Sequence, residues 1–135
     1  MHVSSDKAPE PVGPYPHARK VGNLLFLSGV GPRRRGIKEI PGVTVDEKGN
    51  ILAYDIEQQC HSVFQNVRSI LEASGSRWEN LVDVTVFLTN MKDDFPRFNK
   101  IYAEYFKENQ PCRTTVEVNA LPTPIAIELK CIATI

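Results

Sequence analysis

The sequence predicts an α+β domain in which two helices pack on one face of a single mixed β-sheet. Three segments alternate apolar and polar side chains with a period of two, which is typical of strands with unlike faces. Two other segments repeat apolar residues at a spacing of three and four, as amphipathic helices do. The 135 residues fit one domain. We therefore expect a single domain over residues 1–135, with residues 1–12 as an extended lead-in.

The first half of the chain begins the sheet and then leaves it. Residues 23–28 form a short apolar run that predicts a buried strand. Residues 29–50 are rich in Gly and Pro, which predicts a long loop. Near the end of this loop we expect residues 43–45 to pair with residues 51–53 in a small two-stranded ribbon.

Two helices are predicted from capping signals and apolar stripes. Asp55 is a good N-cap for the first helix, Gln58 completes a capping-box pattern, and Gly75 is suited to end the helix. The second helix is expected to begin at Asp94, because the proline two residues later is tolerated in a first turn. Pro111 prevents this helix from continuing.

Three strands carry the alternation that assigns the faces of the sheet, over residues 82–88, 113–119 and 125–131. Two helices cover only one face, so an aliphatic set should lie beneath them and a polar set should face away. That polar face is either solvated, or buried against other subunits where an Arg and a Glu pair with each other or with a ligand. The expected aliphatic set is Val84, Val86, Val116, Val118, Ile127 and Leu129, and the expected polar set is Phe87, Arg113, Thr115, Glu117, Ala126, Glu128 and Lys130.

Composition and charge exclude several classes of protein. The 16 Lys and Arg residues balance 16 Asp and Glu residues, whereas a nucleic-acid binder usually has a basic excess. No run approaches the roughly 18 apolar residues of a membrane span, and the N-terminus has no secretory signal. The three cysteines are far apart, and no metal-ligand cluster or phosphate-binding glycine motif is present. We expect a cytoplasmic protein with no nucleic-acid or membrane partner, no cofactor and no metal.

Several separated motifs, in matching order, resemble the Rid family of reactive intermediate deaminases. The resemblance runs from Gly13 to the C-terminus. Within the family the chain is most similar to the bacterial 2-aminomuconate deaminases, because Tyr15 is followed by Pro-His-Ala and Gly29 by Val30. The family motifs in this chain include Gly13-Pro14-Tyr15, Leu27-Ser28-Gly29, Asn66-Val67, Thr85-Val86-Phe87-Leu88, Pro111-Cys112-Arg113, Leu121-Pro122 and Ile127-Glu128-Leu129.

The resemblance implies a Rid or chorismate-mutase-like fold whose sheets form a central barrel in a homotrimer, alone or as a dimer of trimers, with sites between subunits. It implies that Arg113 binds the substrate carboxylate, which a planar guanidinium can hold through two hydrogen bonds. It also implies that Glu128 moves protons and handles water. Glu117, on the same predicted face, is the alternative proton-transfer group. The other residues implied to line the site are Tyr15, Ser28, Gly29, Phe87 and Cys112.

The resemblance predicts cofactor-independent hydrolytic deamination of 2-aminomuconate to 4-oxalocrotonate and ammonia, in the breakdown of aromatic compounds. Two alternatives stay open: a general deaminase of 2-enamino and 2-imino acids, and a non-enzymatic trimer that binds small acids. A dicarboxylate substrate also needs a partner for its second acid. The basic run Arg33-Arg34-Arg35 follows Ser28-Gly29, so we expect at least one of these arginines, assisted by His17, to contact that acid.

Overall fold

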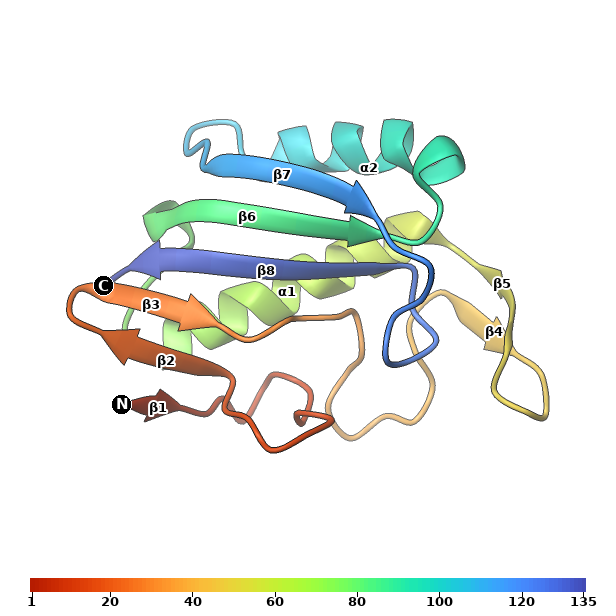
Figure 1. Cartoon of the computed structure of the whole chain (residues 1–135), viewed down its shortest axis with the longest axis horizontal. Helices are drawn as coiled ribbons and strands as arrows, with labels where there is room; N and C mark the ends of the chain where they lie inside the picture. The colour runs from red at the N-terminus through yellow and green to blue at the C-terminus, as the bar shows by residue number, and fades with distance from the viewer.

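The computed structural model describes residues 1–135 as a six-stranded sheet with two helices on one face and a separate two-stranded ribbon (Figure 1). The strand order is β1-β2-β3-β8-β6-β7, and only β6 and β7 are parallel neighbours. The prediction of two helices on a mixed sheet is confirmed. The elements are β1 (His2–Val3), β2 (Ala18–Val21), β3 (Leu24–Leu27), β4 (Val43–Val45), β5 (Ile51–Tyr54), α1 (Ile56–Ala73), a 3-10 helix (Trp78–Asn80), β6 (Leu81–Leu88), α2 (Met91–Tyr105), β7 (Cys112–Glu117) and β8 (Ile127–Thr134).

The first helix and the ribbon before it form where their local signals place them. The Asp55 side chain accepts hydrogen bonds from the amides of Glu57 and Gln58, as expected of an N-cap. Gly75, with a φ of 77°, follows the last turn of α1 in the left-handed conformation that glycine adopts readily. The predicted ribbon is present as β4 paired with β5. Neither helix is both long and apolar enough to cross a membrane.

The second helix begins one turn earlier than predicted. α2 starts at Met91 rather than at Asp94, because Asn90 accepts a hydrogen bond from the Asp93 amide and so caps the helix there. Pro96 consequently lies inside the helix rather than in its first turn. The proline gave the weaker of two signals, since an asparagine three residues before an aspartate is itself a good helix start.

Two strands near the N-terminus were not predicted. β2 pairs with β3 in an antiparallel hairpin whose turn is Gly22-Asn23, and Gly22 has a φ of 62°. β1 lies within residues 1–12, expected to be only an extended lead-in, and pairs with β2 at the edge of the sheet. The Gly-Asn dipeptide was the available signal, because this pair is typical of two-residue hairpin turns.

β7 presents the opposite faces from those predicted. It runs parallel to β6, with Arg113 beside Val84 and Thr115 beside Val86. Side-by-side residues on neighbouring strands point to the same face, and both valines are fully buried in the core beneath the helices. The residues assigned to the wrong face are Arg113, Thr115, Val116 and Glu117 of β7, together with Ala126, which is fully buried just before β8.

The inner face of β7 is polar because it meets the first amide and polar and aromatic side chains of α2 at the edge of the core. Glu117 accepts a hydrogen bond of 2.8 Å from the amide of Met91, the first residue of α2, which is a favourable place for a carboxylate. Arg113 donates to Asn99 Oδ1 at 2.9 Å, and its guanidinium lies 4.6 Å from the ring centroid of Tyr102. These contacts turn Arg113 and Glu117 of the edge strand toward the helices, although the alternation of apolar residues in β7 predicts the opposite orientation.

Thr115 gives a direct test of this orientation. Its hydroxyl is buried without a hydrogen-bond partner, a situation that costs about 1–3 kcal/mol. We expect Thr115→Val to raise the free energy of unfolding by about 1 kcal/mol in urea denaturation, because valine keeps the shape and removes the hydroxyl. Thr114→Val is the matched control, since it changes an exposed residue of the same strand. A larger gain from the control would contradict the assigned faces.

Candidate active site

A cleft of about 150 Å³ lies where the N-terminal segment, the segment after β3 and the loop before β8 meet. Arg33 and Glu128 are the only charged residues in its lining. Four of the predicted site residues therefore lie together although they come from three separate parts of the sequence. The cleft is lined by Val12, Tyr15, Gly29, Gly31, Arg33, Pro122, Thr123, Ile125 and Glu128.

Glu128 is the acidic group of the cleft. It is half-buried on β8, beside Phe87 of β6, and both side chains lie on the face that the helices leave open, as predicted. No side chain or backbone amide of the protein pairs with its carboxylate, and burial raises the pKa of this carboxyl group above its ordinary value. Such a carboxyl keeps its proton to a higher pH than an ordinary glutamate, which suits a group that takes up and releases protons.

Gly29 lies against Glu128 at a distance that only glycine permits. A Cβ atom at Gly29 would lie 2.8 Å from Oε2 of Glu128, so a larger residue would displace the carboxylate. The next residue, Val30, pairs with Leu129 through two backbone hydrogen bonds of 2.8 and 2.9 Å. This pairing holds the segment after β3 beside β8 and so fixes one wall of the cleft.

Two polar side chains of α1 fix the turn that follows, and sequence reasoning assigned them no role. Asn66 Nδ2 donates to the carbonyls of Gly31 at 2.9 Å and Arg33 at 2.7 Å. The Ser62 hydroxyl donates to the carbonyl of Pro32 at 2.7 Å. The available signal was a buried pair of polar residues four positions apart on an otherwise amphipathic helix.

His17 and Ser28 lie beside the cleft, in a smaller pocket that shares Tyr15, Gly29, Gly31 and Arg33 with it. His17 is buried: its Nδ1 accepts a hydrogen bond of 2.9 Å from the Ser5 amide, and its Nε2 donates to a backbone carbonyl at 2.7 Å. Both ring nitrogens are therefore used to hold the N-terminal segment. The Ser28 hydroxyl likewise donates to a backbone carbonyl, at 2.7 Å.

The three arginines of the basic run have different surroundings. Arg35 donates to two backbone carbonyls of the N-terminal segment, at 2.7 and 3.1 Å, and forms an ion pair with Glu10 at 3.1 Å. Arg34 donates to Asn66 Oδ1 of α1 at 3.4 Å. Only Arg33 lines the cleft. Arg34 and Arg35, predicted as possible substrate contacts, thus bind other parts of the protein.

Arg113 and Cys112 lie outside the cleft of their own chain. Arg113 is on the helix-covered face of β7, whereas Glu128 is on the open face of β8, and β6 lies between the two strands. Cys112 is exposed at the start of β7. One chain by itself does not bring the predicted carboxylate anchor and the predicted proton-transfer group to the same substrate.

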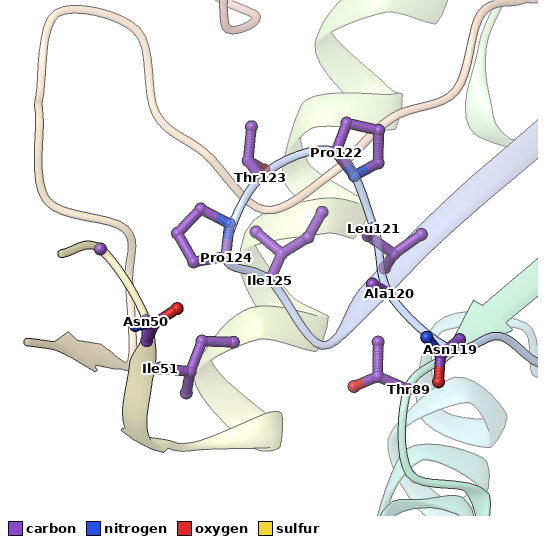
Figure 2. Close-up of a pocket in the computed structure, with 11 residues that line it drawn as sticks. Asn50, Ile51, Thr89, Asn119, Ala120, Leu121, Pro122, Thr123, Pro124 and Ile125 are labelled. Atoms are coloured by element: carbon purple, nitrogen blue, oxygen red, sulfur yellow. The ribbon is translucent and has the colours of Figure 1, made fainter.

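A larger groove of about 480 Å³ lies on the other side of the loop before β8 (Figure 2). Pro122, Thr123 and Ile125 line both the groove and the cleft, so this loop is the wall between them. No titratable side chain lines the groove, whose far side is formed by residues 49–51 at the tip of the β4–β5 ribbon. The smaller cleft with Glu128 is therefore the candidate active site.

A family model described as endoribonuclease L-PSP matches residues 5–135. The chain belongs to the Rid/RutC family. A RutC family protein of Pyrococcus horikoshii is 41% identical over 132 residues, which are 97% of this chain and 94% of that protein. A protein of Dermatophagoides farinae named 2-iminobutanoate/2-iminopropanoate deaminase is 34% identical over 134 residues, which are 98% of this chain and 94% of that protein.

Solved structures of Rid/RutC-like proteins match the whole fold. A structure from Thermotoga maritima is 37% identical with a TM-score of 0.85, covering 100% of this chain and 97% of that one. The structure of Escherichia coli TdcF with bound serine is 28% identical with a TM-score of 0.85, covering 100% and 98%. The family recognised from the sequence motifs is thus confirmed, whereas the finer likeness to 2-aminomuconate deaminases stays a prediction.

The unpaired Glu128 carboxylate should lower stability at neutral pH. Its pKa is higher in the folded protein than in the unfolded chain, so ionisation favours unfolding as the pH rises through these two values. We expect Glu128→Gln to raise Tm at about pH 7 and to leave it unchanged at about pH 3, where both states are largely protonated. Glu117→Gln is the control, because the Glu117 carboxylate accepts a hydrogen bond and should not gain stability. Equal Tm changes at both pH values would contradict this account.

Proposed function

We propose that the protein hydrolyses 2-imino and 2-enamino acids to 2-oxo acids and ammonia. The observation that carries this proposal is the half-buried Glu128 carboxyl, which has a raised pKa and no partner in the cleft. The name of the Dermatophagoides relative, with its two 2-imino acid substrates, supports the same reaction class. All three cysteines are free thiols, which fits the cytoplasmic location predicted from the sequence.

The reaction needs one group that moves protons between water and nitrogen. An enamine first takes a proton at carbon and becomes a protonated imine. Water then adds to C2: its oxygen forms the new bond, the C=N electron pair moves to nitrogen, and Glu128 accepts a proton from the water. Glu128 returns this proton to nitrogen and the C–N bond breaks. Ammonia leaves as the oxygen on C2 forms the carbonyl and releases its remaining proton.

A second copy of the chain supplies the carboxylate anchor in this proposal, within a homotrimer whose sites lie between subunits. Arg113 lies on the edge strand β7 and donates only to Asn99, so most of its guanidinium N–H groups are free for a ligand. The sheet exposes Val21, Leu24 and Val116, which are 55%, 36% and 37% exposed. These apolar side chains lie apart on the sheet and are open to contact with other copies.

Within this reaction class we propose 2-aminomuconate as the specific substrate and 4-oxalocrotonate as the product. A muconate carries two carboxylates, and the cleft offers Arg33 in addition to the Arg113 that a second copy would bring. The test compares kcat/KM for enzymatically generated 2-aminomuconate with kcat/KM for 2-iminopropanoate. A large preference for 2-iminopropanoate would leave the general deaminase as the function.

Assays on the same preparation of protein distinguish deamination from two other functions. A non-enzymatic trimer would bind small acids and release no ammonia from any imine. RNA cleavage, which the family description names, is disfavoured by the balance of 16 basic and 16 acidic residues, because phosphate backbones are bound mainly by a basic excess. Cleavage of RNA that disappears in a Glu128→Gln variant would contradict this preference.

Replacing Glu128 tests its role in the chemical step. We expect Glu128→Gln to keep the fold and the assembly but to lower kcat by about 100-fold or more, because glutamine keeps the shape and cannot exchange the proton. Glu117→Gln is the matched control, since Glu117 accepts a hydrogen bond from the start of α2 and lies outside the cleft. If Glu117→Gln loses activity while Glu128→Gln remains active, the two assignments must be exchanged.

Mixing two inactive variants tests the site between copies. Arg113→Lys keeps the charge but loses the planar fork, so we expect it to be nearly inactive alone, as Glu128→Gln is. After unfolding and refolding together in equal amounts, random mixing should restore about one quarter of the sites, because each restored site takes Arg113 from one chain and Glu128 from another. No recovery in mixed assemblies would place both groups of a site on one chain. Near-normal activity of Arg113→Lys would remove Arg113 as the anchor.

A further inference from the structure

We propose that Arg33 forms a second anion-binding subsite, which makes the protein selective for 2-imino or 2-enamino acids with another carboxylate at the far end. The proposal rests on the deaminase function proposed above, which accounts for the first carboxylate. It assigns to one arginine the role that the sequence left among three. Its basis is the position, the free hydrogen-bond donors and the rigid support of Arg33.

Arg33 has most of its hydrogen-bonding capacity free. Its guanidinium donates one hydrogen bond, of 2.8 Å, to the backbone carbonyl of Glu10. An arginine side chain carries five N–H donors, so the other four have no partner in the protein. The carboxylate of Glu10 forms an ion pair with Arg35 and none with Arg33. Arg33 is thus a half-buried cation without an anion.

The cleft places this cation beside Glu128 without pairing the two. Both residues line the same space of about 150 Å³, yet no ion pair joins them. The Arg33 side chain is only partly buried, and a bound carboxylate could accept two of its free N–H donors in the paired geometry that arginine prefers. Glu128 and Arg33 therefore line one cleft and are both free to contact the same ligand.

The backbone that carries Arg33 is fixed before any ligand binds. Asn66 and Ser62 of α1 hold the carbonyls of three successive residues, which end at Arg33. The residue before it, Pro32, is buried and has a restricted backbone. This fixed support lowers the entropy lost when the arginine engages an anion.

The reaction decides which carboxylate Arg33 would bind. C2 must lie at Glu128, and the first carboxylate is bonded directly to C2, where the proposed function places Arg113 of a second copy. Arg33 is then left for a group farther along the substrate. If Arg33 instead bound the first carboxylate, its removal would weaken mono- and dicarboxylic ligands equally.

Two inert ligands that differ only in the second acid test the subsite without any turnover. Muconate and sorbate share a six-carbon diene chain, and only muconate has a carboxylate at both ends. Calorimetric titration of the assembled protein should give an affinity for muconate at least about 10-fold higher than for sorbate, as expected for one charge-assisted hydrogen-bonded pair. Because neither ligand can be deaminated, a failure of the proposed reaction would not alter this result.

Variants of the arginine complete the test. We expect Arg33→Gln to lose the preference for muconate while its affinity for sorbate stays unchanged, and Arg33→Lys to retain part of the preference. Lys38→Gln is the control, because it removes one exposed positive charge from the same loop and should keep the full preference. Equal wild-type affinities, a preference that survives in Arg33→Gln, or equal losses for both ligands would each overturn the proposal. Should Arg33→Gln not fold, Arg33→Lys carries the same comparison.

Discussion

The backbone pairing of Val30 with Leu129 is the contact on which the candidate site depends. It continues the pairing with β8 past the end of β3, so the chain stays beside β8 for a few more residues. Glu128 and Gly29 precede the paired residues and are thereby pressed together at a distance that excludes a side chain. Without this pairing the loop after β3 would leave the sheet, and the acid would lie on an open strand in water.

Most of the fold could be predicted because its signals are local. The Asp55 cap, the glycine after α1 and the apolar stripes of both helices each act within a few residues, and the chain folds accordingly. The alternation of β6 and β8 also gave the correct faces, because both are central strands with apolar residues on one side. Local signals were enough to predict a segment correctly wherever its conformation depends only on its own capping residues and on the burial of its own apolar face.

The errors and omissions concern contacts between distant segments. β7 follows the requirements of α2, whose first amide needs the Glu117 carboxylate, rather than its own apolar alternation. The partner that each arginine of Arg33-Arg34-Arg35 binds depends on where Glu10 and Asn66 lie in the fold. The spacing of residues in the sequence does not contain that information. Recognition of family motifs pointed to Glu128 and Tyr15, which line the cleft, whereas the contacts by which Ser62 and Asn66 support it emerged only from the structure.

β8 occupies the centre of the sheet although it is made after every other strand. Its pairing with β3 joins Leu24 to Thr134, and its other neighbour is β6. During synthesis, β3 and β6 therefore lack their β8 partner until this strand leaves the ribosome. Their unpaired backbone groups can meanwhile pair with other chains. Long-range pairing of this kind also slows folding. The cleft, built from both ends of the chain, should be among the last features of a new molecule to appear.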